Sequence, residues 1–442
     1  MTYLSTLFGA VKKPYRRMYM KRRDSSGNYE STWQRIDIRD GISRVNSWGT
    51  VEFAIDAEKV IINSWDVSQV QIALANNDGW FNSSSDSRSF WFRYLDHKDT
   101  KLKLDVGIYD INGDVLGETT LFEGLIISGE NTSDVNTSFT VADYSKKLDE
   151  ISFAGMIADG AYNVTDILDV IEANNNVITY FNTINFDPKR DVEITIDSTE
   201  KDIWRESIWQ VLQYLATVSM STISVIGDSI NLKARDDLVG VRAYWTSEGN
   251  ILETADGLEF CVTGDGSTDL IIYGVGSQSP YNNLTLYGSV NLDRGGADKL
   301  YTTIIETSTG SKVQSVIPSL LIEGRTKEID LSDLTTLGDK TDVINDFLAR
   351  FGVKRPTIQF SCAFLGGLVY PFSVVAVNNE GRQLLSDNLF VWDVSIWDSS
   401  DRWGEKQGSN KTFQTENFIV ERISYNLDDW FCSIFGRLKN SL

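Results

Sequence analysis

Short runs in which apolar and polar residues alternate make up most of this chain. In the clearest run, residues 101–111, every second position is apolar (Leu102, Leu104, Val106 and Ile108). This period is typical of a β-strand with one buried face. Asn112-Gly113 follows, a pair that favours a tight hairpin turn, and apolar residues recur from 119 to 128. The pattern predicts an antiparallel hairpin.

Further strands are predicted where similar runs lie between turn residues. They cover residues 137–142, 192–196, 223–226, 229–233, 270–273, 301–305, 357–360 and 374–377.

Three segments have helical spacing instead. One is capped by Thr165 and has its apolar residues on one face, and one covers residues 201–217. The third begins near Thr341 and ends at Gly352, a residue that favours a helix C-terminus. Few helices among many strands predict a β-dominated α+β chain of several domains. Lapses in periodicity place the predicted domains at residues 1–152, 153–236, 237–338 and 339–442.

Charge is distributed unevenly along the 442 residues. The net charge is −21, and residues 105–202 hold 20 acidic and 5 basic residues. An acidic chain holds nucleic acid poorly, because that binding depends on clustered cations. The exception is a segment of twelve residues without an acid, which holds Lys12, Lys13, Arg16, Arg17, Lys21, Arg22 and Arg23. Aromatic residues interleave with these cations, and we interpret the segment as a charged edge strand; the alternative is a binding arm.

Few residues suggest catalysis or metal binding. His97 is the one histidine and lies in a polar run, so a catalytic dyad or a histidine-rich metal site is not expected. The three cysteines have no CxxC spacing, which argues against a zinc site or a disulfide framework. Residues 110–114 begin like a calcium loop, but the glycine is misplaced for one and a hairpin turn explains them. The sequence therefore predicts no cofactor and no enzyme.

Three tryptophans form a candidate contact surface. Trp392, Trp397 and Trp403 lie in a polar stretch, residues 387–409. Exposed indoles in a loop are suited to stack on sugars or to anchor a protein partner. Alternatively, they pin a long loop onto its own domain.

Several motifs together resemble the hub proteins of bacteriophage tails. Residues 68–82 (SQVQIALANNDGWFN) resemble the strand and polar turn that open the first domain of these proteins. Residues 120–126 (TLFEGLI) are similar to the family's "LFEG" strand, and residues 139–148 (FTVADYSKKL) to its ending of strand, Asp and small helix. The C-terminal order of helix and strands, with residues 418–425 (FIVERISY), is also similar.

The resemblance implies a structural virion protein of the tail, made in the host cytoplasm. Its first and last domains would be tube-like β-barrels or sandwiches with smaller α+β domains between them, and a homotrimer would form a pseudo-sixfold ring. Implied partners are the tail tube or distal tail protein on one side and a central fibre or spike protein on the other. DNA would pass through the ring without specific binding, and Asp105 and Glu123 are the candidate acids of its lumen.

Other functions fit parts of the same pattern. A distal tail protein, which is a hexamer, shares the pattern of the first domain. A receptor- or carbohydrate-binding tail protein would use the tryptophans, and a cell-envelope hydrolase would need two acidic residues converging in a cleft.

Overall fold

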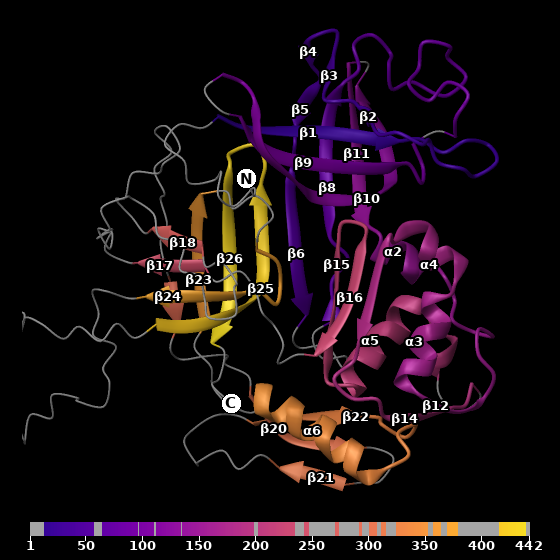
Figure 1. Cartoon of the computed structure of the whole chain (residues 1–442), viewed down its shortest axis with the longest axis vertical. Helices are drawn as coiled ribbons and strands as arrows, with labels where there is room; N and C mark the ends of the chain where they lie inside the picture. Colours follow the sequence, from indigo (N-terminus) through magenta and orange to yellow (C-terminus); the bar gives the residue numbers. More distant parts are fainter. Residues whose placement is uncertain are drawn as a thin grey trace, which may run out of the picture.

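The computed structural model describes residues 13–56, 64–95, 97–109, 112–133, 135–198, 202–234, 243–246, 270–273, 291–293, 300–306, 311–314, 324–351, 357–363, 369–378 and 415–438 (Figure 1). Strands predominate over helices in these residues, and several sheets share the chain. The predicted β-dominated α+β class with several structural units is confirmed.

The first sheet has seven antiparallel strands, in the order β2-β1-β9-β10-β11-β8-β5. They are β1 (Lys13–Lys21), β2 (Gln34–Arg35), β5 (Val45–Ser47), β8 (Gln69–Ala75), β9 (Lys101–Tyr109), β10 (Val115–Ser133) and β11 (Asn136–Asp143). A small hairpin, β3 (Ile38–Arg39) and β4 (Ile42–Ser43), lies beyond this sheet at the top of Figure 1.

The hairpin predicted around Asn112-Gly113 is formed by β9 and β10. Gly113 has a φ of 89°, the left-handed conformation that such a turn requires. The return strand is longer than predicted, because β10 begins at Val115 and ends at Ser133. Its pairing with β9 shifts between Thr120 and Phe122, which lets Leu121 and Phe122 both be buried.

The second sheet combines strands from distant parts of the sequence. Its main order is β18-β17-β24-β25-β26-β23-β19, and β6 pairs with β25 and β7. The strands are β6 (Thr50–Asp56), β7 (Ser64–Trp65), β17 (Ala243–Thr246), β18 (Leu270–Tyr273), β19 (Asn291–Asp293), β23 (Thr357–Ala363), β24 (Val374–Asn378), β25 (Thr415–Asn426) and β26 (Phe431–Leu438). This sheet therefore crosses the predicted domain limits, which remain predictions.

The chain passes from one sheet to the other at a single glycine. Gly49 follows β5 and precedes β6, and its φ is 73°. A Cβ at this position would lie 2.1 Å from the carbonyl oxygen of Gln71. Only glycine fits so close to a neighbouring backbone in this conformation.

A helical unit, here residues 144–234, packs beside the first sheet (Figure 1). It contains α2 (Ser145–Asp149), β12 (Gly160–Asn163), α3 (Val164–Glu172), α4 (Asn175–Tyr180), β13 (Thr183–Asp187), β14 (Glu193–Ile196), the 3-10 helix η1 (Asp202–Arg205), α5 (Ile208–Val218), β15 (Ser221–Ile226) and β16 (Ser229–Ala234). Buried residues of α5 such as Leu212 and Leu215 join one continuous core with Phe122 and Val141 of the first sheet.

A smaller unit completes the described fold. It holds β20 (Leu300–Glu306), β21 (Ser311–Gln314), β22 (Gly324–Ile329) and α6 (Leu337–Phe351). None of the helices in the described part of the chain has both the length and the apolar content that crossing a bilayer requires.

The three predicted helices are α3, the η1–α5 pair and α6. The prediction that Thr165 caps α3 was wrong, because Asn163 is the N-cap residue. The backbone N–H of Asn163 donates to the Asp166 carboxylate at 3.1 Å. Thr165 lies inside the helix and donates to Asp191 instead. Its hydroxyl made Thr165 a plausible cap, but Asn at this position caps at least as well.

Candidate functional site

The predicted edge strand is β1. β9 pairs with all of it, whereas β2 pairs only with Tyr19 and Met20 on the other side. Met18 directs its backbone to that outer side, where its carbonyl accepts from the N–H of Ile36 at 2.9 Å. Alternate residues of a strand direct their backbone groups to the same side, so the backbone of Pro14 faces the same side as that of Met18. A proline has no backbone N–H, so this position leaves no unpaired donor at the edge. Within the described residues, no strand covers this half of the edge.

The described cations of this segment are held within the protomer. Arg17 lies 2.8 Å from Glu118, Arg22 lies 2.5 Å from Glu30, and Arg23 lies 3.2 Å from Asp99. The Lys21 ammonium lies 5.2 Å from the centre of the Trp33 ring. These contacts favour an edge strand over a free binding arm. Lys12 lies outside the described residues, and only the backbone of Lys13 is described.

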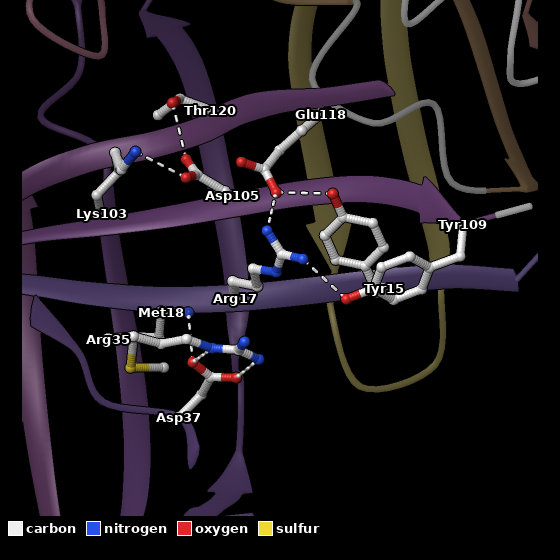
Figure 2. Close-up of polar contacts among 10 residues, drawn as sticks. All are labelled: Tyr15, Arg17, Met18, Arg35, Asp37, Lys103, Asp105, Tyr109, Glu118 and Thr120. Carbon is white, nitrogen blue, oxygen red and sulfur yellow. Dashed lines mark hydrogen bonds and ion pairs between the residues drawn. The ribbon is translucent and has the colours of Figure 1, made fainter. Parts of the chain in front are cut away.

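Polar side chains form a connected network on one face of β1, β9 and β10 (Figure 2). Glu118 accepts hydrogen bonds from the Tyr15 hydroxyl at 2.7 Å and from Arg17 at 2.8 Å. Arg17 also donates to the Tyr109 hydroxyl at 2.9 Å. Burial, with the nearby Glu118 carboxylate, raises the pKa of Tyr15. This face is therefore neutralised by internal pairs and is not a bare acidic surface.

Asp105 lies on the same face, in a separate group of contacts. Its carboxylate lies 2.7 Å from the Lys103 ammonium and accepts from the Thr120 hydroxyl at 2.8 Å (Figure 2). The residue is 2% exposed, and burial raises the pKa of its carboxyl group. Glu123 is 9% exposed and accepts from the Tyr144 hydroxyl at 2.6 Å.

The burial of both acids corrects the expectation that they face an open lumen. They do alternate with core residues, as predicted, but neighbouring side chains cover them within one protomer. The alternation gave the face of the strand correctly. It gave no information about the cations and hydroxyls that the neighbouring strands bring over that face.

The junction between the two sheets was not predicted. The Arg16 guanidinium lies between two indole rings, 4.9 Å from the centre of Trp48 and 5.4 Å from that of Trp430. Asp428 accepts from the backbone N–H of Trp48 at 3.0 Å and from the Ser47 hydroxyl at 2.8 Å. The turn between β25 and β26 is thus fastened to the turn between β5 and β6.

An aromatic core lies behind this junction. Phe53 of β6 has ring centres of Tyr370, Trp65, Phe122 and Tyr425 within 6.4 Å. Since Phe122 belongs to the first sheet and Tyr425 to the second, the two sheets share one apolar interior. The sequence contained one signal for this junction, which is the Trp48-Gly49 pair directly before a strand.

Asp143, within the segment that resembles the family's "strand, Asp, small helix", is fully buried at a corner. It accepts from the Trp65 indole at 3.2 Å and from the backbone N–H groups of Ser68 at 2.9 Å and Ser145 at 3.0 Å. Burial raises the pKa of this carboxyl group. The aspartate joins the end of β11 to the starts of α2 and β8, which is a structural role.

His97 is the remaining candidate in the described part of the chain. The His97 ring lies 5.9 Å from that of Phe139. Among the residues that the structure describes, no group of three metal-binding side chains converges. Trp392, Trp397 and Trp403 lie outside the described residues, so their role as a contact surface remains a prediction.

Comparisons with known proteins give a likeness in fold. No family model and no curated protein matches the sequence. A tail protein from Neisseria meningitidis MC58 is similar in structure, with a TM-score of 0.52 and 11% identity over 96% of this chain and 97% of that one.

Two further solved structures align with a TM-score of 0.47. One is prophage tail protein gp18 from Listeria monocytogenes EGD-e, which is 8% identical over 96% of this chain and 95% of its own. The other is the 43 kDa tail protein of prophage MuSo2 from Shewanella oneidensis, which is 11% identical over 96% of this chain and 98% of its own. This chain has the fold of the Neisseria meningitidis tail protein, which confirms at the level of the fold the resemblance to tail proteins that its sequence predicted.

Proposed function

We propose that the chain is a structural tail hub protein that assembles as a homotrimeric, pseudo-sixfold ring. The observation that carries this proposal is the presence of two large sheets in one chain, fastened to each other by the Arg16 and Asp428 contacts. A protomer of this kind supplies two units to a ring, so a threefold assembly presents six similar units. Such a ring is suited to join a hexameric tail tube to a threefold tip.

Open strand edges support assembly with further copies. Within the described residues, β5 ends one side of the first sheet, and the N-terminal half of β1 has no strand partner on the other. Uncovered edges promote uncontrolled pairing in an isolated protein. A closed ring pairs or covers them in one defined way.

The partners follow from this position in a tail. They are other copies of the chain, a tail tube or distal tail protein on one face, and a central fibre or spike protein on the other. DNA passes through without specific binding, because a chain with a net charge of −21 repels it. The carboxylates responsible are those that remain in water, since Asp105 and Glu123 are covered. The protein needs no cofactor and no catalytic activity for this role.

The mass of the purified protein in solution tests the proposal. Light scattering after size-exclusion chromatography is expected to give three times the protomer mass of 49.7 kDa at micromolar concentration. A hexamer would favour a distal tail protein instead. A monomer at every concentration would contradict both assignments.

A further inference from the structure

Two cysteines that are far apart in the sequence are paired in the second sheet. Cys362 of β23 and Cys432 of β26 lie directly opposite each other in the antiparallel register of these neighbouring strands (Figure 1). The third cysteine, Cys261, lies outside the described residues. The cysteine spacing predicted no disulfide framework, and a single pair across two strands leaves no motif in the sequence. Only the strand pairing brings these two residues together.

The backbone separation of such a pair suits a disulfide bond. Residues directly opposite in an antiparallel ladder have Cα atoms about 4.5 Å or about 5.5 Å apart, depending on whether the two residues exchange hydrogen bonds. A disulfide bond needs a Cα separation of about 4.4–6.8 Å. Both kinds of position fall within this range, so the bond can form with the two strands in their present register.

Cys432 lies in the apolar interior. It is 0% exposed, as is Tyr425, its register partner in β25 on the other side. Ile434, the next residue on the same face of β26, is 1% exposed. Burial makes a cysteine react slowly, because reagents reach it poorly. We therefore expect a structural crosslink that forms slowly with a small oxidant, and not a rapid redox sensor.

A bond at this position would fasten one end of β23. Among the described residues, β19 pairs only with residues 357–359 of β23, so β26 is the one strand that pairs with the end that contains Cys362. Two residues before Cys432, the Trp430 ring contacts Arg16 at the junction of the two sheets. The crosslink would therefore hold the end of β23 beside that junction.

The proposed place in a virion supplies the oxidising step. Thiols persist in a reducing cytosol, whereas disulfide bonds form and persist outside the cell. A tail protein passes from the first environment to the second when the particle leaves its host. This change of environment rests on the proposed function, but the pairing of the two cysteines does not.

We propose that Cys362 and Cys432 form a disulfide bond within one chain after the particle is released, which fastens β23 to β26. An S–S bond forms between the two Sγ atoms as both S–H bonds break. The two thiols together lose two electrons and two protons, and dissolved oxygen takes up both and becomes hydrogen peroxide. A covalent link of this kind disfavours the unfolded chain, which strand pairing alone does not constrain.

Counting the thiols of the full-length protein tests the pair. The protein is purified with a reductant, transferred to buffer that contains dissolved oxygen, and denatured at intervals for reaction with a thiol reagent. We expect the three thiols of the reduced chain to fall to one, with a peptide link between Cys362 and Cys432 in mass spectrometry. Three thiols that persist through long exposure with a copper catalyst would overturn the proposal, as would a link that includes Cys261 or joins two chains.

Two matched variants assign the thiols that are lost. Cys261→Ala keeps the pair and should lose both of its remaining thiols, whereas Cys362→Ala should keep both of its own. Loss of thiols in Cys362→Ala at the wild-type rate would contradict the pairing. The wild type provides the same comparison without a substitution, because its oxidised form can be reduced again.

Urea denaturation of the oxidised and the reduced wild type measures what the bond does. We expect oxidation to lower the equilibrium constant for unfolding of the second sheet by roughly thirtyfold or more, as disulfide bonds typically do. Equal stability of the two forms would show that the bond does not fasten β23. Light scattering of the reduced protein tests the trimer separately, so either proposal can fail without the other.

Discussion

The first sheet is attached to its two neighbours by contacts of different chemistry. Its junction with the second sheet is apolar and aromatic, with Phe53 at 1% exposure and Arg16 stacked between two indoles. Its contact with the helical unit includes a charged lysine and a carboxylate. An aromatic interior changes little with pH, whereas a contact that includes titratable groups changes with it. We therefore expect the contact with the helical unit to respond to pH more than the junction of the two sheets does.

The largest expected effect is at the centre of the junction of the two sheets. Phe53→Ala removes a ring that touches aromatic residues of both sheets, and we expect it to lower the free energy of unfolding by about 3–5 kcal/mol. Ile42→Ala is the control, because Ile42 is 68% exposed and its truncation should change stability by about 0.5 kcal/mol or less. Urea denaturation measures both. A loss of similar size in the two variants would mean that the junction contributes little.

A backbone substitution tests the passage between the sheets. Gly49→Ala puts a Cβ against the Gln71 carbonyl, and we expect a loss of about 2–4 kcal/mol from the conformation and the collision together. Gly41→Ala is matched to it, with a φ of 76° and no atom within 4 Å of the added Cβ. Its loss should be about 1–2 kcal/mol, from the conformation alone. Thermal and urea unfolding of both proteins give the difference, and no difference would show that the Gln71 contact relaxes without cost.

A smaller effect is expected from the stacked cation. Arg16→Met keeps the apolar packing between Trp48 and Trp430 but removes the charge, and we expect a loss of about 1 kcal/mol. Arg88→Met removes an exposed arginine that pairs with Asp86, and we expect no measurable loss of stability from it. If the Arg16→Met protein is as stable as the Arg88→Met protein, the Arg16 charge does not contribute to the stability of this junction, and the aromatic residues account for it.

The smallest effect concerns stability as a function of pH at the charged contact with the helical unit. The folded protein raises the pKa of Glu123, so it binds that proton more tightly than the unfolded chain does. Stability contributed by this group is therefore highest at low pH, and it falls as pH rises from the unfolded pKa through the folded one. Glu123→Gln should remove this fall, leaving the variant more stable than the wild type at neutral pH. Urea denaturation at several pH values checks this, and a variant less stable at neutral pH would reverse the sign.

Local features of the chain could be predicted because nearby residues cause them. The alternation from Leu102 to Ile108 and the glycine at position 113 predict the β9–β10 hairpin. Apolar spacing in α5 predicts a buried helix. The short helix α4 was missed, since its six residues are too few to show a clear period.

The sequence alone determined the β-rich class, the main hairpin, the three longer helices and the likeness to phage tail proteins, because these depend on short periods, turn residues and local motifs. Only the tertiary structure decided that β6 joins the C-terminal strands, that Arg16 lies between Trp48 and Trp430, and that Asp105 and Glu123 are covered. Strand partners and the neighbours of a charged side chain come from residues far apart in the chain. A two-residue period says which face of a strand a side chain occupies, but not what other strands bring to that face.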